Sequence, residues 1–243
     1  NFQEININCG CPSNKVIDGN FGACLMKEPI KVSKMIEAIR EETDIPITVK
    51  TRIGLDNFDT NEFLEEFISE LYSINTKTVI IHARIAILKG ISPHENRTIP
   101  PLNYERVKLI KNSFKDMNII INGGINNLTE AKWHLNTFDG SMIGRAAWDN
   151  PWMFKDADNL FYNMKNNITR SEIIHKYVKY SDKYIDIGHS QRRLVRPLFN
   201  LFYGIQGSKI WKQQLNEVAN NQISINSIYD LASQLEETIE VAA

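Results

Sequence analysis

The alternation of apolar and polar positions in the first part of the chain predicts five short strands separated by helices. The predicted strands cover residues 4–9, 47–52, 78–82, 118–122 and 140–143. Between them apolar residues recur at helical spacing, as in the segment that begins at Pro29 and carries Val32, Ile36 and Ile39. Nearly all-apolar strands that alternate with helices are typical of a parallel sheet built from βαβ units.

Beyond about residue 156 the strand pattern stops. Helices are predicted over residues 169–187, 191–203, 209–219 and 227–240, the first with Thr169 and Glu172 as a capping box. We therefore predict an α/β domain over residues 1–155, followed by a small all-helical domain over residues 156–243.

Composition limits the function classes. The chain has 243 residues, 42% of them hydrophobic, and a formal net charge of −1. This charge balance excludes a global basic field, so any RNA-binding surface must be local. Three cysteines do not form a disulfide framework, and no histidine pair completes a zinc site, so we predict no metal. No apolar run reaches the roughly 18 residues of a membrane span, and the sequence shows no signal-peptide pattern, so we expect a cytoplasmic protein.

Cys11 is the first candidate for chemistry. Gly10 and Pro12 end the first predicted strand and hold Cys11 at its carboxyl end, where ligands gather in α/β folds. A thiol with the ordinary pKa of about 8.5 is mostly protonated at neutral pH, so it could donate a proton as well as attack a substrate. The structural alternative is that Cys11 is a small buried hydrophobe.

The last two predicted strands end in glycine, at Gly123-Gly124 and at Gly144-Arg145. In (β/α)8 barrels a phosphate often binds the loops after strands seven and eight, where glycine lets the backbone approach and arginine offers paired donors. If these are strands seven and eight, the strand before Cys11 is the fourth, and strands one to three are absent from this chain.

A local basic segment lies in the predicted helical domain, because residues 187–215 contain no acidic residue. It carries five basic and four aromatic residues: Arg192, Arg193, Arg196, Lys209, Lys212, Phe199, Phe202, Tyr203 and Trp211. This mixture predicts an RNA-facing patch. Aromatic residues at this spacing are, however, more often part of a helical core.

Seven motifs together resemble the tRNA-dihydrouridine synthase family, most closely its A-type bacterial branch. They are NINCGCPS at 6–13, FGACLM at 21–26, VKTRIG at 49–54, IHAR at 81–84, SPHENR at 92–97, INGGI at 121–125 and GR at 144–145. The resemblance runs in order over residues 4–151 and continues more loosely into the helical domain.

The resemblance implies an FMN enzyme on a TIM (β/α)8-type barrel, here strands 4–8, that reduces uridine to 5,6-dihydrouridine in the tRNA D-loop at U20 and U20a. NADPH is the implied reductant. FMN would give a hydride to C6 of uridine, and Cys11, matching the catalytic cysteine, would give a proton to C5. It also implies a monomer in full-length form, with tRNA as partner.

The resemblance also assigns binding residues. Those implied to hold FMN are Lys50, His82, Asn122, Gly123, Gly124, Gly144 and Arg145. Those implied to contact tRNA are Asn8, His94, Arg97, Lys209 and Lys212. Without the resemblance, Lys50 is equally typical of a surface charge at a strand end, and His82 is more typical of a hydrogen-bonded core histidine.

Two departures bear on these expectations. Cys9 stands where the family has an apolar residue, so a second thiol near the flavin or a disulfide with Cys11 is conceivable. The absent strands would leave an unpaired sheet edge, so we expect the chain as given to bind FMN weakly and to aggregate. Two rival functions stay open: an FMN-barrel reductase of a small pyrimidine or enone, and a non-catalytic RNA-binding protein.

Overall fold

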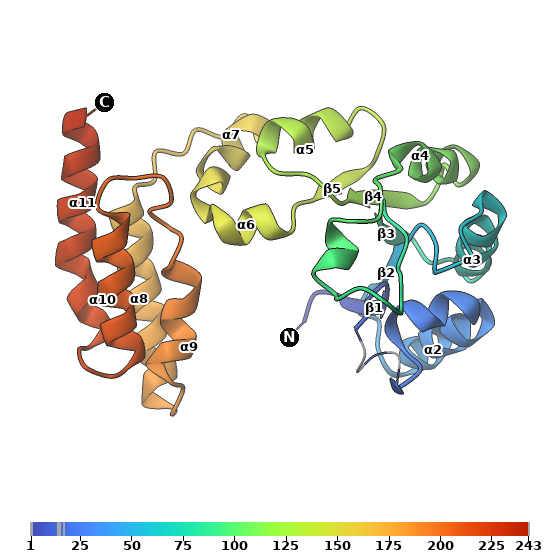
Figure 1. The fold of residues 1–243 in the computed structure, drawn as a ribbon, viewed down its shortest axis with the longest axis horizontal. Helices are drawn as coiled ribbons and strands as arrows, with labels where there is room; N and C mark the ends of the chain where they lie inside the picture. The colour runs from blue at the N-terminus through green and yellow to red at the C-terminus, as the bar shows by residue number, and fades with distance from the viewer. Residues whose placement is uncertain (1, 14–15, 17, 243) are drawn as a thin grey trace. The chain divides into compact units, whose positions relative to one another are not determined.

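The computed structural model describes residues 2–13, 16 and 18–242 of the 243-residue chain (Figure 1). It divides into two compact units, Asn1–Gly144 and Arg145–Ala243. We call them the α/β unit and the helical unit and describe each by itself.

The α/β unit contains one five-stranded parallel sheet. Its strands are β1 (Ile5–Cys9), β2 (Ile47–Arg52), β3 (Thr78–His82), β4 (Asn118–Asn122) and β5 (Gly140–Met142), and they lie side by side in sequence order. This sequential order of parallel strands is that of a TIM-type barrel wall. The predicted α/β class is confirmed, and the described strands form an arc of such a wall.

In the described part of the unit, the first four strands are followed in turn by α2 (Pro29–Glu42), α3 (Asn61–Ser73), α4 (Tyr104–Ser113) and α5 (Leu128–His134). Helix α2 packs on α3 and α3 on α4, as Figure 1 shows. Beneath them the strands bury one row of apolar side chains, which register places on one face: Ile7, Val49, Val79 and Ile119. Residues at alternate positions of each strand therefore face away from these helices.

The helical unit begins with α6 (Arg145–Asp149), η3 (Pro151–Asp156) and α7 (Ala157–Tyr162). It continues with α8 (Arg170–Asp186), α9 (Gln191–Val195), η4 (Arg196–Leu198), α10 (Ser208–Ala219), η5 (Ile225–Ser227) and α11 (Ile228–Ala242). Thr169 and Glu172 form the predicted capping box of α8. The predicted helix over residues 191–203 begins at Gln191 as expected, but its predicted end is wrong, because α9 stops at Val195. Pro197, which lacks an N–H, lies in the following 3-10 turn.

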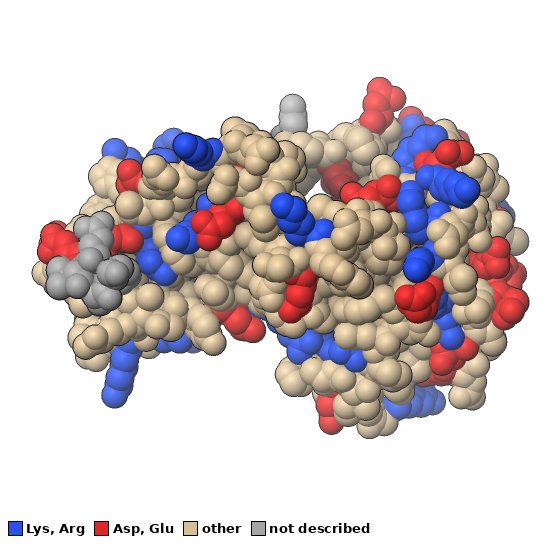
Figure 2. All heavy atoms as spheres, turned by 90° about the horizontal axis from the view of Figure 1, so that it is seen from above, with Lys and Arg blue, Asp and Glu red and all other residues tan. Residues whose placement is uncertain are grey.

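Surface charge is mixed on the face in Figure 2, where basic and acidic side chains are interspersed. This agrees with the net charge of −1. Among the described helices none has both the length and the apolar character needed to cross a bilayer.

Arg170 is buried in the helical unit and generates a test of its packing. Its Nε donates to the Leu201 carbonyl at 3.0 Å, its guanidinium stacks 4.1 Å from the Trp152 ring centre, and it pairs with Glu236 at 3.9 Å. We expect Arg170→Met to lower the unfolding free energy by about 3 kcal/mol, because the Leu201 carbonyl loses its donor and the Glu236 carboxylate, although it keeps its hydrogen bonds from Ser171, loses its cation.

Urea unfolding followed by circular dichroism measures this loss. The matched control is Lys176→Met, which removes an exposed cation from the same helix and should change stability by no more than about 0.5 kcal/mol. Equal stability of both variants would show that the buried guanidinium does not support the unit.

Candidate active site

The sheet face turned away from the helices is polar. Register places Asn8 beside Lys50, and Arg52 beside His82. His82 in turn lies beside Asn122. Because side chains alternate along each strand, the apolar residues between these positions serve the core and the polar residues gather on one surface at the carboxyl ends of the strands.

The turn that carries Cys11 is fixed from both sides. The Asn8 side-chain oxygen accepts hydrogen bonds from the N–H groups of Gly10 at 3.0 Å and Cys11 at 3.1 Å. The Cys11 carbonyl accepts from the Ala23 N–H at 3.0 Å. Gly22, at φ +59°, passes so close that a Cβ there would lie 2.8 Å from the same carbonyl. These contacts hold the turn at the end of β1 in place. Cys11, which lies on this turn, is half-buried.

Lys50 and Asn122 meet across the intervening strand β3. Lys50 Nζ donates to Asn122 Oδ1 at 3.1 Å, and Asn122 Nδ2 donates to the Met142 carbonyl at 2.8 Å. Burial, with a smaller contribution from the Arg52 charge, lowers the pKa of Lys50 to about 8; Cys11 acts in the opposite direction. The structure thus brings together two residues that the sequence assigned to one cofactor.

Arg52 is a site residue that sequence reasoning missed. It is 4% exposed. Its Nε donates to the Gly10 carbonyl, and its Nη1 donates to the carbonyls of Ile85 and Asn96, each at 2.9 Å. Burial lowers the pKa of Arg52 to about 10. The available signal was an arginine at the end of a predicted strand, within the motif VKTRIG quoted above.

The connection between β3 and α4 is held by Asn96, which is fully buried. Its side chain accepts from the Ile87 N–H at 2.8 Å and donates to the Ile87 carbonyl at 2.7 Å. His94 and Arg97 flank Asn96 and are exposed. The loop thereby presents these two predicted residues to solvent, while Asn96 and Arg52 anchor it to the Cys11 turn.

The glycines after β4 expose backbone beside His82. Gly123 has φ +112°, and a Cβ there would lie 2.5 Å from His82 Cδ2; Gly124 has φ +71°. Tyr104 Oη donates to the Gly123 carbonyl at 2.6 Å. Gly144, by contrast, has no atom within 4 Å of its notional Cβ. The two predicted phosphate loops therefore differ: one is closely packed and the other is open.

Three other predicted residues lie in the helical unit. Arg145 is the first residue of α6, and Lys209 and Lys212 are exposed on α10. Their assigned roles toward FMN and tRNA stay predictions.

The α/β site carries a surplus of positive charge. Within the described part of the chain, neither Lys50 nor Arg52 forms a salt bridge with a carboxylate. The charges of Arg84 and Arg97 act on Arg52 as further cations. No group of three or more His, Cys, Asp or Glu side chains suited to a metal occurs among the residues searched. The site therefore suits an anionic ligand.

A thiol, a lysine and glycine-bearing turns thus lie at the carboxyl ends of the parallel strands, the edge at which TIM-type barrels form their active sites. The model of the dihydrouridine synthase (Dus) family matches residues 1–239, so the chain belongs to this family. It is similar to the tRNA-dihydrouridine(20/20a) synthase of Shewanella oneidensis, with 40% identity over 242 residues, covering 99% of this chain and 72% of that protein.

Two further relatives carry the same name. The protein of Vibrio cholerae is 42% identical over 221 residues, which cover 90% of this chain and 68% of the relative. The protein of Pseudomonas putida is 36% identical over 235 residues, covering 96% and 70% respectively. The predicted family and its enzyme class are thereby confirmed.

The lowered pKa of Lys50 can be measured directly. We expect one methylated lysine signal to titrate near pH 8 in ¹³C-methyl NMR, against about 10.4 for ordinary lysines. Because the folded pKa lies below the unfolded one, the stability contribution of Lys50 should rise between pH 8 and about 10.5, by up to about 3 kcal/mol. The spectrum of Lys50→Met assigns the signal, because this variant lacks the Lys50 amine but keeps the α-amine at the start of the chain, which also titrates near pH 8. A Lys50 titration near 10.4 would contradict the burial argument.

Proposed function

We propose that this chain reduces uridine to 5,6-dihydrouridine in the D-loop of tRNA, at U20 and U20a, with FMN as cofactor and NADPH as reductant. The observation that carries the proposal is the Cys11 thiol, held on a rigid turn beside the cationic face that contains Lys50. The names of the curated relatives support tRNA as substrate.

The residues present fit FMN. Gly123 and Gly124 adopt positive φ values that favour glycine, and no atom lies within 4 Å of a notional Cβ at Gly144, so the backbone of that last turn is open to a phosphate. We assign phosphate binding to Asn122, to these glycines and to Arg145. Lys50 and His82 would contact the ring system, and Lys50 supplies the positive charge that favours an anionic reduced flavin. When bound, FMN supplies the hydride that adds to C6 of uridine.

Cys11 would act as the general acid. As the C5=C6 bond of uracil accepts a hydride at C6, negative charge develops toward C5, and a thiol proton delivered to C5 completes the reduction. Asn8 and Ala23 fix the backbone on either side of this thiol by the hydrogen bonds described above. Asn8 therefore positions the acid, in addition to the tRNA contact that we assign to it.

The protein would recognise the tRNA mainly through its shape and its sugar–phosphate backbone. A uridine in a folded tRNA must leave its stack to reach the thiol, and the flanking nucleotides are then recognised through phosphate and ribose. We assign contacts close to the reacting base to Asn8, His94 and Arg97, and a second contact to Lys209 and Lys212. The exposure of Arg97, Lys209 and Lys212 agrees with that role.

The test of the reaction is Cys11→Ala. We expect dihydrouridine formation, measured by mass spectrometry of digested tRNA, to slow by about 10² to 10⁴, the usual contribution of a general acid. Flavin content and tRNA affinity should be unchanged. Cys24→Ala, which removes another half-buried thiol, is the matched control. Unchanged activity of Cys11→Ala would refute its role, and no dihydrouridine from the wild type would refute the proposed function.

Gly144→Ala tests the phosphate loop separately from the fold. Because no atom lies within 4 Å of the added Cβ, we expect the unfolding free energy to stay within about 0.5 kcal/mol of wild type. The methyl group would still obstruct a phosphate at the backbone, so the affinity for FMN, measured by flavin fluorescence, should fall. Gly123→Ala should lower stability as well, because its Cβ collides with His82. Equal FMN affinity of wild type and Gly144→Ala would remove this loop from the site.

A further inference from the structure

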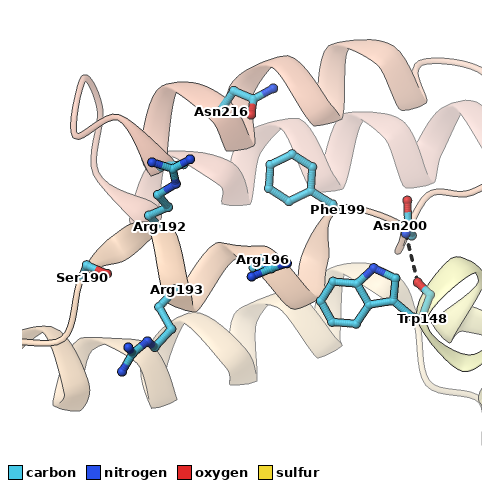
Figure 3. A pocket seen from close by; sticks show the side chains of 9 residues that line it. Trp148, Ser190, Arg192, Arg193, Arg196, Phe199, Asn200 and Asn216 are labelled. Atoms are coloured by element: carbon cyan, nitrogen blue, oxygen red, sulfur yellow. Dashed lines mark hydrogen bonds between the residues drawn. The ribbon is translucent and has the colours of Figure 1, made fainter. Parts of the chain in front are cut away.

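The helical unit contains a pocket of about 750 Å³ that the dihydrouridine reaction itself does not need (Figure 3). Its walls come from three places in the unit: α6, the α9–η4 segment and α10. The residues used below are Trp148, Arg192, Arg196, Phe199, Asn200 and Asn216. Pockets of about 300 to 1,000 Å³ are typical of small-ligand sites, so this one can hold a nucleotide.

One wall is a stripe of cations that ends in an aromatic ring. Arg192, Arg196 and Phe199 follow one another at intervals of four and three residues, which places them on one side of the α9–η4 segment. In Figure 3 Arg196 reaches toward the Trp148 ring, and its guanidinium carbon lies 5.9 Å from the ring centre. The pocket therefore offers planar cationic groups beside flat apolar surfaces.

The indole of Trp148 is held but not covered. The Asn200 side chain donates a hydrogen bond to the Trp148 carbonyl at 2.9 Å, and the residue is 51% exposed. Of the aromatic residues in the predicted RNA-facing patch, Phe202 and Trp211 belong to the core instead, with exposures of 1% and 0%. Trp148, outside that segment, replaces them as an accessible stacking surface.

The positive charge of the pocket is not neutralised within the described part of the chain. Neither arginine of the stripe forms a salt bridge there, and residues 187–215 contain no acidic residue. The cations continue along α10, because Lys209, Lys212 and Asn216 recur at helical spacing on one side of that helix. Asn216 lines the pocket, so the two lysines extend its charge beyond its rim.

We infer that this pocket binds one unpaired nucleotide of the tRNA, with its base stacked on Trp148 and Phe199 and its phosphate between Arg192 and Arg196. The inference rests on the proposed function for the identity of the RNA. Aromatic platforms beside arginines are the general means of holding single-stranded bases. A free nucleotide would need only the pocket, whereas cations continuing along α10 suit the next phosphates of a polymer.

Binding of a short single-stranded oligouridylate to the full chain tests the inference without flavin or reductant. Trp148→Ala should weaken binding about tenfold, the usual loss of one stacked base, and Trp148→Tyr should keep most of the affinity. Arg196→Ala should reduce the slope of log K against log salt by about one phosphate contact. Lys176→Ala, on α8 and outside the pocket, is the control that loses one exposed cation.

Each other outcome has a definite meaning. If Trp148→Ala and Arg196→Ala bind the oligonucleotide like wild type, the inference is overturned. It is also overturned if a blunt RNA duplex of equal length depends on Trp148 to the same extent, or if AMP binds as tightly as the oligonucleotide. Dihydrouridine formation by the wild type is measured separately, so failure of the reductase function is distinguished from failure of this pocket.

Discussion

The site depends on one buried guanidinium. Arg52 joins three loop segments through the carbonyls of Gly10, Ile85 and Asn96. Hydrogen bonds to a charged group contribute about 1.5 to 3 kcal/mol each, and here they replace water around a cation that is 4% exposed. Because Gly10 directly precedes Cys11, the same guanidinium fixes the turn that carries the thiol. The position of the candidate acid is thus tied to the loop that presents His94 and Arg97.

This arrangement carries an electrostatic cost. Lys50 and Arg52 point from one strand to the same face, and burial lowers the pKa of both. A sheet optimised for stability alone would place apolar residues or carboxylate partners there. Cations retained without carboxylates create a positive potential before any ligand arrives, and such preorganised charge favours negative charge in a ligand or transition state. Local conflict with the rules of stable packing is typical of functional sites.

The strands were predictable because a parallel sheet covered by helices requires apolar runs, as in β3 and β4. The resemblance assigned Lys50 and Asn122 to the same cofactor, and the structure brings them together because strand ends of a parallel sheet share one edge. The role of Arg52 could not be predicted from the sequence. Its three partners are backbone carbonyls from distant loops, and every residue has such a carbonyl, so no residue type marks these partners. The predicted end of helix 191–203 is wrong because the helical spacing of apolar residues continues past Pro197, whereas α9 ends before this proline. The sequence alone does not show which aromatic residues of the basic segment belong to the core. Trp211, for example, is buried only because of the way α10 packs against its neighbouring helices.

The two thiols near the site show how much is decided by strand alternation. Cys9 lies in β1 on the same face as Ile7 and is fully buried, and burial raises its pKa to about 12. A proton held that tightly is of little use to a general acid, and a thiol without solvent access reacts slowly. Cys11 lies beyond the strand on the turn fixed by Asn8 and is half-buried. The two cysteines lie only two residues apart, yet Cys9 belongs to the core and Cys11 is the candidate for chemistry. A shift of β1 by one residue would exchange its buried and polar faces and remove Asn8 from Lys50, so the register of this strand determines which sulfur can act.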